Sequence, residues 1–268
     1  MIEARDTDAK GGADFWPEYK PGDRDPGSRS KLLYAGAAAV ALVAIIAVAV
    51  VVLTGGGGDD KGKAPAAAAD NGTKASPTAY TPQLAEKSMA KLAARTADAR
   101  PVTAGEVFTA DAKSVKYRKF TFALAGSQLS TDCKAVTWGT RLQGDLATAG
   151  CTQILRGAYV SSDKSHVGQW MAINLSGQDG ANQIVRDLDP NTQAGFVLPL
   201  KAEGMPAFGT GFSAAYAQAY GHYVVVTWVQ RAGGATPSSL NEMIDASLAI
   251  DKPTDFVWGR LEMADGNQ

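Results

Sequence analysis

The sequence predicts an α+β domain preceded by one transmembrane helix, the domain being a two-layer antiparallel sheet with helices on one face, ferredoxin-like or related. Two observations lead to this prediction. Residues 32–53 form one apolar run without a charged side chain, and residues 116–268 alternate between strand-like and helix-like patterns. We therefore expect a disordered tail over residues 1–31, a membrane span over 32–53, a flexible linker over 54–115 and a folded domain over 116–268.

The apolar run is long enough to cross a bilayer as a helix. Its 22 residues would rise about 33 Å at about 1.5 Å per residue, against a hydrocarbon core of about 30 Å. A cleaved signal peptide and a buried helix are the alternatives. The apolar part of a signal peptide is only about 7–15 residues long and lies near the chain start, whereas 31 residues precede this run. We expect residues 32–53 to have the lipid bilayer as their partner.

The charges that flank the run predict its orientation in the cell membrane. An excess of Lys and Arg stays on the cytoplasmic side of a span. Within 15 residues the run is preceded by four such residues and followed by two, namely Lys20, Arg24, Arg29 and Lys31, then Lys61 and Lys63. A cytoplasmic N-terminus and an extracytoplasmic C-terminal domain follow from this difference.

The segments on either side of the span have the composition of mobile chain. The tail mixes charges with Gly and Pro and shows no periodicity. Three of its aromatic residues could dock a cytoplasmic protein, the alternative being contact with the membrane surface or no role: Phe15, Trp16 and Tyr19. The linker is rich in Gly, Ala and Pro, and only residues 83–98 within it favour a short helix.

The first half of the domain predicts a strand, a helix, a hairpin and a second helix. Residues 117–124 alternate like a half-buried strand, and residues 136–149 favour a helix with Leu142 and Leu146 one turn apart. The apolar runs 152–160 and 167–175 are typical of a hairpin with a longer loop. A helix follows, since apolar residues recur at helical spacing: Ala181, Ile184, Val185 and Leu188.

The second half predicts another hairpin and a last helix. Residues 214–220 alternate small and large side chains, Gly221 and His222 form the turn, and residues 223–229 are an unbroken apolar run typical of a strand covered on both faces. A short strand could form near residues 196–198. Thr236 and Pro237 favour the start of the last helix, whose expected core face is Leu240, Met243, Ile244, Ser247 and Leu248.

The two cysteines of the chain, Cys133 and Cys151, both lie in the expected extracytoplasmic domain. A lone pair in such a domain is usually a disulfide, although two free thiols or a bond between chains remain open. One straight helix over residues 134–150 would hold the pair about 25 Å apart, which is too far for a disulfide. An intramolecular bond therefore requires a shorter helix that begins near Thr140, with the preceding residues folded back along it.

The composition and the motifs do not point to catalysis. The domain carries 12 Lys/Arg against 13 Asp/Glu, which is not the basic surface of a nucleic-acid partner. His166 and His222 are its two histidines, and neither stands at metal-ligand spacing from another ligand. We expect His222 to serve turn geometry, with ligand contact as the alternative for both histidines and for Tyr159, whose ring more often packs in a core. No catalytic, cofactor or metal site is expected.

Several motifs of the domain resemble a known group of proteins. From Cys133 to Tyr159 the chain has the pattern C-x-A-V…L…L…G-C-T-Q-x-L-R-G-A-Y, followed later by G-T-G and G-H-Y-x-x-x-T-W. Over residues 117–250 this resembles uncharacterised single-pass membrane proteins of actinobacteria, of the streptomycete type. The resemblance implies an Ala-rich anchor, an envelope-facing domain and paired cysteines, and it brings no assigned activity.

These observations together predict a membrane-anchored extracytoplasmic binding, sensing or structural module of the cell envelope, without enzymatic activity. An envelope protein or a glycan would be its ligand. The alternative is an envelope hydrolase with an unrecognised active site, which a histidine beside a serine and a carboxylate in a pocket would favour. A subunit of a larger envelope complex is a third reading, and a broad exposed apolar patch would favour it.

Overall fold

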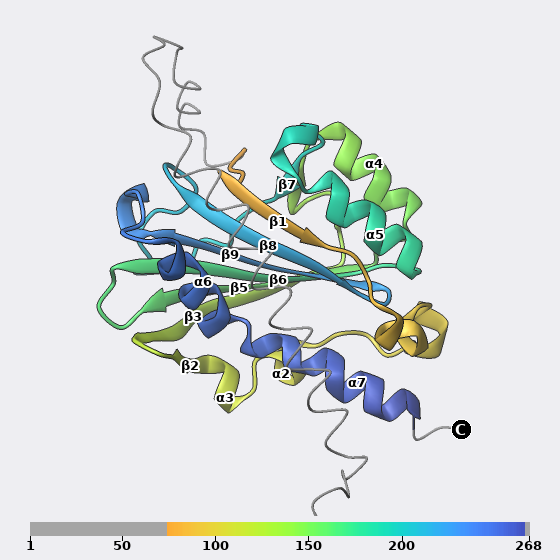
Figure 1. Ribbon diagram of the computed structural model, residues 1–268. Helices are drawn as coiled ribbons and strands as arrows, with labels where there is room; N and C mark the ends of the chain where they lie inside the picture. The colour runs from red at the N-terminus through yellow and green to blue at the C-terminus, as the bar shows by residue number, and fades with distance from the viewer. Residues whose placement is uncertain (1–73, 266–268) are drawn as a thin grey trace, which may run out of the picture. The chain divides into compact units, whose positions relative to one another are not determined.

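The computed structural model describes residues 74–265 of the chain. The predicted tail, the span over 32–53 and the docking aromatics Phe15, Trp16 and Tyr19 lie outside this part. The described residues form an α+β domain around one curled, seven-stranded mixed sheet, a half-barrel with helices packed against it (Figure 1). None of the helices within residues 74–265 has the length and apolar character that a membrane crossing requires.

The large sheet has the strand order β1-β8-β9-β6-β5-β3-β2. All neighbours are antiparallel except β1, which runs parallel to β8. The strands are β1 (Ala79–Gln83), β2 (Ser114–Tyr117), β3 (Phe120–Ser130), β5 (Gln153–Ser161), β6 (His166–Asn174), β8 (Ser213–Tyr220) and β9 (Tyr223–Arg231). The predicted α+β class is confirmed, but a purely antiparallel, ferredoxin-like sheet is wrong, because a segment far upstream adds the parallel edge strand.

Helices and a small second sheet complete the fold. The short strands β4 (Thr137–Trp138) and β7 (Phe196–Val197) pair with each other outside the large sheet. The α-helices are α2 (Ala104–Val107), α3 (Ala110–Lys113), α4 (Thr140–Thr148), α5 (Gln178–Asp187), α6 (Leu240–Ile250) and α7 (Asp255–Asp265). The 3₁₀ helices are η1 (Lys87–Leu92), η2 (Arg95–Ala97), η3 (Pro190–Thr192), η4 (Ala232–Gly234) and η5 (Lys252–Thr254).

Both faces of the large sheet are covered, so the prediction of helices on one face is wrong. On one face α4 and α5 pack over alternate residues of β9 such as Val226 and Trp228. On the other face α6 and α7 pack over Tyr223 and Val225 (Figure 1). The reason lies in the central strands, whose side chains are apolar on both faces and need cover on both.

Part of the predicted linker belongs to the fold. β1 pairs with β8 along its whole length, and η1 buries Met89 and Leu92 completely or nearly so, at 2% and 0% exposure. The helix expected over residues 83–98 is present instead as two 3₁₀ helices, η1 and η2. These segments are too short for a periodic pattern, and their stability comes from partners distant in sequence.

Most other elements agree with the prediction. The strands of both hairpins lie within a residue or two of their expected positions, and α5 begins three residues before Ala181, the first residue of its expected pattern. The last expected helix begins at Leu240 rather than at Thr236–Pro237, and Leu248 is 37% exposed rather than buried. The sequence reading missed α7, which ends the described part of the chain.

Candidate functional site

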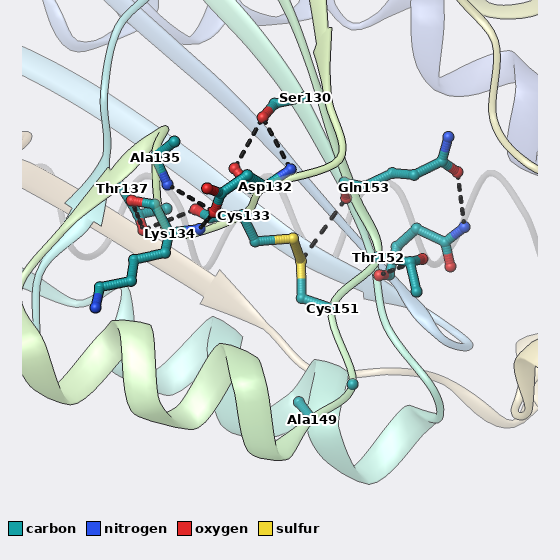
Figure 2. Close-up of a disulfide and its surroundings, with 12 residues drawn as sticks. Ser130, Asp132, Cys133, Lys134, Ala135, Thr137, Ala149, Cys151, Thr152 and Gln153 are labelled. Carbon is teal, nitrogen blue, oxygen red and sulfur yellow. Dashed lines mark hydrogen bonds between the residues drawn. A yellow bond between two sulfur atoms is a disulfide. The ribbon is translucent and has the colours of Figure 1, made fainter.

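The disulfide lies between the end of β3 and the end of α4 (Figure 2). Cys133 and Cys151 are bonded, with their Cα atoms 6.4 Å apart. The bond can close because α4 begins only at Thr140, as the sequence required. Asp132 shapes the fold-back, since its Oδ1 accepts hydrogen bonds from the main-chain N–H groups of Lys134 and Ala135 at 3.0 and 3.1 Å. A disulfide persists in oxidising compartments, which is consistent with an extracytoplasmic domain.

His166 begins β6, directly after a loop that Asp163 organises. The Oδ1 atom of Asp163 accepts hydrogen bonds from the Oγ atoms of Ser161 and Ser165, at 2.6 and 2.7 Å. The main-chain N–H of Ser165 donates to the same oxygen at 3.0 Å. Hydrogen bonds from Ser161 and Ser165 hold the pKa of Asp163 below its ordinary value. This carboxylate therefore fixes the loop that presents His166.

A serine, the histidine and a carboxylate form one hydrogen-bonded row at this loop. Ser165 Oγ lies 2.7 Å from His166 Nδ1, and His166 Nε2 lies 2.8 Å from Glu242 Oε1 on α6. Both the histidine and glutamate side chains are buried, at 8% and 3% exposure. This is the combination that would favour a hydrolase, and the sequence reading did not connect Glu242 with it.

Glu242 is the anchor of this row. Burial raises its pKa, but hydrogen bonds from Ser238 and His166 and the charge of Arg231 lower it more, to about 2. Its Oε2 accepts the main-chain N–H of Ser238 at 2.6 Å, and Arg231 Nε lies 3.3 Å from Oε1. An ionised Glu242 can only accept, so the hydrogen of this bond is on His166 Nε2. One pattern in the sequence could have drawn attention to Glu242: Ser239-Leu-Asn-Glu242 matches S-x-x-E, which is typical of the start of a helix.

The row lacks the second half of an acyl-transfer site. Such a site needs preorganised donors, commonly a pair of main-chain N–H groups, for the developing oxyanion. In the loop, the N–H groups of Ser162, Lys164, Ser165 and His166 already donate to Thr121 O, Ser161 O, Asp163 Oδ1 and Ser161 Oγ. The loop of residues 161–166 thus offers no such pair, and the row fastens the hairpin to α6.

His222 lies in the turn between β8 and β9, where the sequence placed it. Its main-chain N–H donates to Leu92 O at 2.8 Å, and its carbonyl accepts from Leu175 N at 3.1 Å. The side chain is fully buried, and neither ring nitrogen has a hydrogen-bond partner among the described residues. Burial lowers its pKa to about 4, with Asp98 acting in the opposite direction. A buried neutral ring cannot serve as an exposed proton shuttle.

A buried ion network lies next to this turn. Arg260 on α7 donates to Asp98 Oδ2 at 2.9 Å, to Glu106 Oε2 at 2.6 Å and to the phenol oxygen of Tyr223 at 2.7 Å. It also donates to the carbonyls of Arg100 and Pro101. Its guanidinium is thus satisfied within the protein, and the network fastens the C-terminal helix to residues 98–106. Sequence reasoning missed it because its members lie up to 162 positions apart.

Tyr159 and the other large rings belong to the core. Tyr159 is fully buried on β5, and its hydroxyl donates to Ala112 O at 2.6 Å. Trp170, Tyr223 and Trp228 are equally buried. All four rings therefore pack in the core of the domain.

A cavity of about 370 Å³ opens between α6, α7 and β2. Neither histidine lines it. The residues that do are Asp111, Ser114, Val115, Lys116, Leu248, Ala249, Asp251, Lys252 and Asp255. Lys252 pairs with Asp255, whereas Asp251 accepts a hydrogen bond from Thr254 Oγ1 at 2.6 Å and has no ion-pair partner within the described residues. Burial raises the pKa of Asp251 to about 6. The sequence reading did not identify this cavity, because its acidic residues come from two distant segments.

Residues 74–265 contain no cluster of three or more His, Cys, Asp or Glu side chains that could hold a metal ion. No protein-family model, curated protein or solved structure matches this chain. The function therefore has to be inferred from the physical features of the domain itself.

Proposed function

We propose that this protein is a membrane-anchored, extracytoplasmic binding or sensing module of the cell envelope. The observation that carries the placement is the disulfide between Cys133 and Cys151, because a thiol pair stays oxidised outside the reducing cytosol. The apolar run at residues 32–53 would be the anchor. The resemblance to actinobacterial single-pass membrane proteins points in the same direction.

A binding role agrees with how the polar side chains of the domain are used. His166 and Glu242, an imidazole and a carboxylate that could perform acid–base chemistry, are engaged within the protein. The cavity next to α6 instead keeps carboxylate and ammonium groups at a partly open surface. Asp251 and Lys116 there could bond the hydroxyl or amide groups of an envelope glycan or of a protein segment.

Protease treatment of intact cells tests the placement. A chain with one epitope at each end should lose the C-terminal epitope to external protease and keep a shortened fragment with the N-terminal one. A maleimide-polymer shift that occurs only after reduction should show that both cysteines are oxidised in the cell. Survival of the C-terminal epitope on intact cells, together with digestion after lysis, would place the domain in the cytoplasm and end the proposal.

An envelope hydrolase is the second candidate, and the row of Ser165, His166 and Glu242 favours it. A fluorophosphonate probe tests it, since such probes label activated serines. We expect no labelling of Ser165, because the loop lacks oxyanion donors. The variant Ser165→Ala and the matched control Ser162→Ala should then be indistinguishable from the parent. Labelling that Ser165→Ala alone removes would establish the hydrolase in place of the binding module.

A further inference from the structure

The segment of residues 84–98, which we name the strap, lies across one end of the sheet. It contains η1 and η2 and covers the β8–β9 turn with Leu92. Three main-chain hydrogen bonds fasten it to the sheet end: His222 N to Leu92 O at 2.8 Å, Gln178 N to Ala93 O at 2.7 Å, and Arg95 N to Ser176 O at 3.0 Å. The contact at the turn is close, since a Cβ on Gly221 would lie 2.2 Å from Leu92 O.

His222 bonds to this strap through its main-chain N–H, and its ring is buried without a polar partner among residues 74–265. It is fully buried, its centroid is 3.9 Å from that of the Tyr223 ring, and both nitrogens are unsatisfied within the described residues. The charged groups that face it are Arg95 and Asp98 from the strap and Arg260 from α7. Asp98 already accepts hydrogen bonds from Tyr223 and Arg260, so two cations and one engaged carboxylate surround the ring.

We propose that the strap is an acid-released cover, which opens from the sheet end when His222 takes up a proton. With the strap closed, a proton on the ring would place a charge in a buried site beside two cations. With the strap lifted, water can solvate the imidazolium. The device depends on the residues around the turn alone and operates whether or not the domain faces the outside of the cell.

The size of the effect follows from proton linkage. The closed strap holds the pKa of His222 near 4, whereas a solvated imidazole has a pKa of about 6.5. The ratio of open to closed strap therefore rises about 30-fold between pH 7.5 and pH 5. The hydrogen bond from Arg260 to Asp98 holds the far end of the strap in place. Opening is therefore confined to the strap.

Release would expose an apolar surface at this end of the domain. Met89 and Leu92 leave the core on the strap side, and Tyr220 and Tyr223 remain on the sheet side. The proposal thus gives the sensing role a specific trigger, namely acidification.

Hydrogen exchange measured by NMR tests the release. The amides of His222, Gln178 and Arg95 should exchange about 30-fold faster at pH 5 than at pH 7.5, after division by the intrinsic exchange rate at each pH. The amides of the central strands β6 and β9 exchange through global unfolding and serve as the internal reference, and the strap amides should have a larger opening constant than these at both pH values. Strap amides that exchange no faster than those of β6 and β9 would show that the strap opens only with the whole domain and overturn the proposal.

Two variants isolate His222, since the chain has only two histidines. His222→Phe keeps a ring of similar shape but cannot titrate, so strap exchange should become the same at both pH values. The matched control His166→Gln should retain the full pH dependence.

The wild-type protein supplies an independent measurement if His222→Phe does not fold. Titration of the two imidazoles by NMR should place one of them near pH 4. A pKa of 6.5 or above for His222, or an unchanged pH dependence in His222→Phe, would sink the proposal.

Discussion

The two histidines stand at opposite ends of the β6–β9 pair, and both are buried but differently partnered. His166 pairs in register with Arg231, and its ring nitrogens bond to Ser165 and Glu242. His222 precedes Tyr223, the partner of Asn174, and its ring has no polar partner among the described residues. Burial alone therefore does not decide what a histidine does. The hydrogen bonds of His166 hold its end of the sheet to α6, and we call this the fastened end. The end at His222 has no such bonds to the ring among the described residues, and it is the end that we propose opens.

Removing the carboxylate at the fastened end should have the largest effect. Glu242→Ala leaves His166 and the N-terminal turn of α6 without their buried anion, and we expect a loss of about 3–4 kcal/mol in the free energy of unfolding. Urea denaturation measures it. The control Asp255→Ala removes an exposed pair with Lys252 and should cost less than about 1 kcal/mol. Equal losses would mean that burial at this end confers no special stability.

Removing the disulfide should lower the free energy of unfolding almost as much, and it should also loosen the strap at the His222 end of the sheet. Replacing Cys133 and Cys151 by Ala opens a loop of 18 residues, which costs about 3 kcal/mol in the chain-entropy model. Arg95 of the strap donates to Gly150 O at 2.7 Å, directly beside Cys151. Strap amides should therefore exchange faster in the double variant, and amides near His166 should not. The reverse pattern would contradict this coupling.

The pH dependence of stability should separate the two ends. The folded state disfavours the proton on His222, so its contribution is complete above about pH 6.5 and is lost as the pH falls toward 4. The loss at pH 5 should be about 2 kcal/mol. Glu242 has a folded pKa of about 2 against an ordinary value of 4.5, so its contribution is lost only below about pH 4.5. Urea midpoints recorded from pH 8 to pH 3 should show both windows, and His222→Phe should remove only the upper one.

The smallest effect should come from the serine of the row. Ser165→Ala removes one hydroxyl that bonds to His166 and Asp163, and we expect a loss of about 1 kcal/mol. The more exposed Ser162 provides the control, and Ser162→Ala should change stability by less than half of that. A loss above about 3 kcal/mol for Ser165→Ala would show that the hydroxyl holds the whole fastened end together.

The sequence predicted those elements whose signal is local. The hairpin strands β5, β6, β8 and β9 and the helix α5 follow from alternation or from helical spacing. A length argument showed that closure of the disulfide requires α4 to begin near Thr140, where it does begin. Each of these arguments needs only residues within about 20 positions of one another.

The features that escaped prediction depend on distant partners. β1 contains a proline and five residues only, and it becomes a strand because β8 pairs with it from more than 130 positions away. Glu242 meets His166 across 76 positions, and Arg260 meets Asp98 across 162. The cavity at Asp251 likewise needs the fold to bring α3 and α7 together. Patterns within a single sequence carry no information on these contacts between distant residues.

The parallel pairing of β1 with β8 has a consequence for how the protein folds during its synthesis on the ribosome. β1 leaves the ribosome first among the described strands, yet its partner emerges more than 130 residues later. The ion pair between Arg260 and Asp98 can form only later, because its two residues lie 162 positions apart. β1 must therefore stay unpaired until β8 has been made, whereas the hairpins β2–β3 and β5–β6 can form as soon as their own strands have emerged.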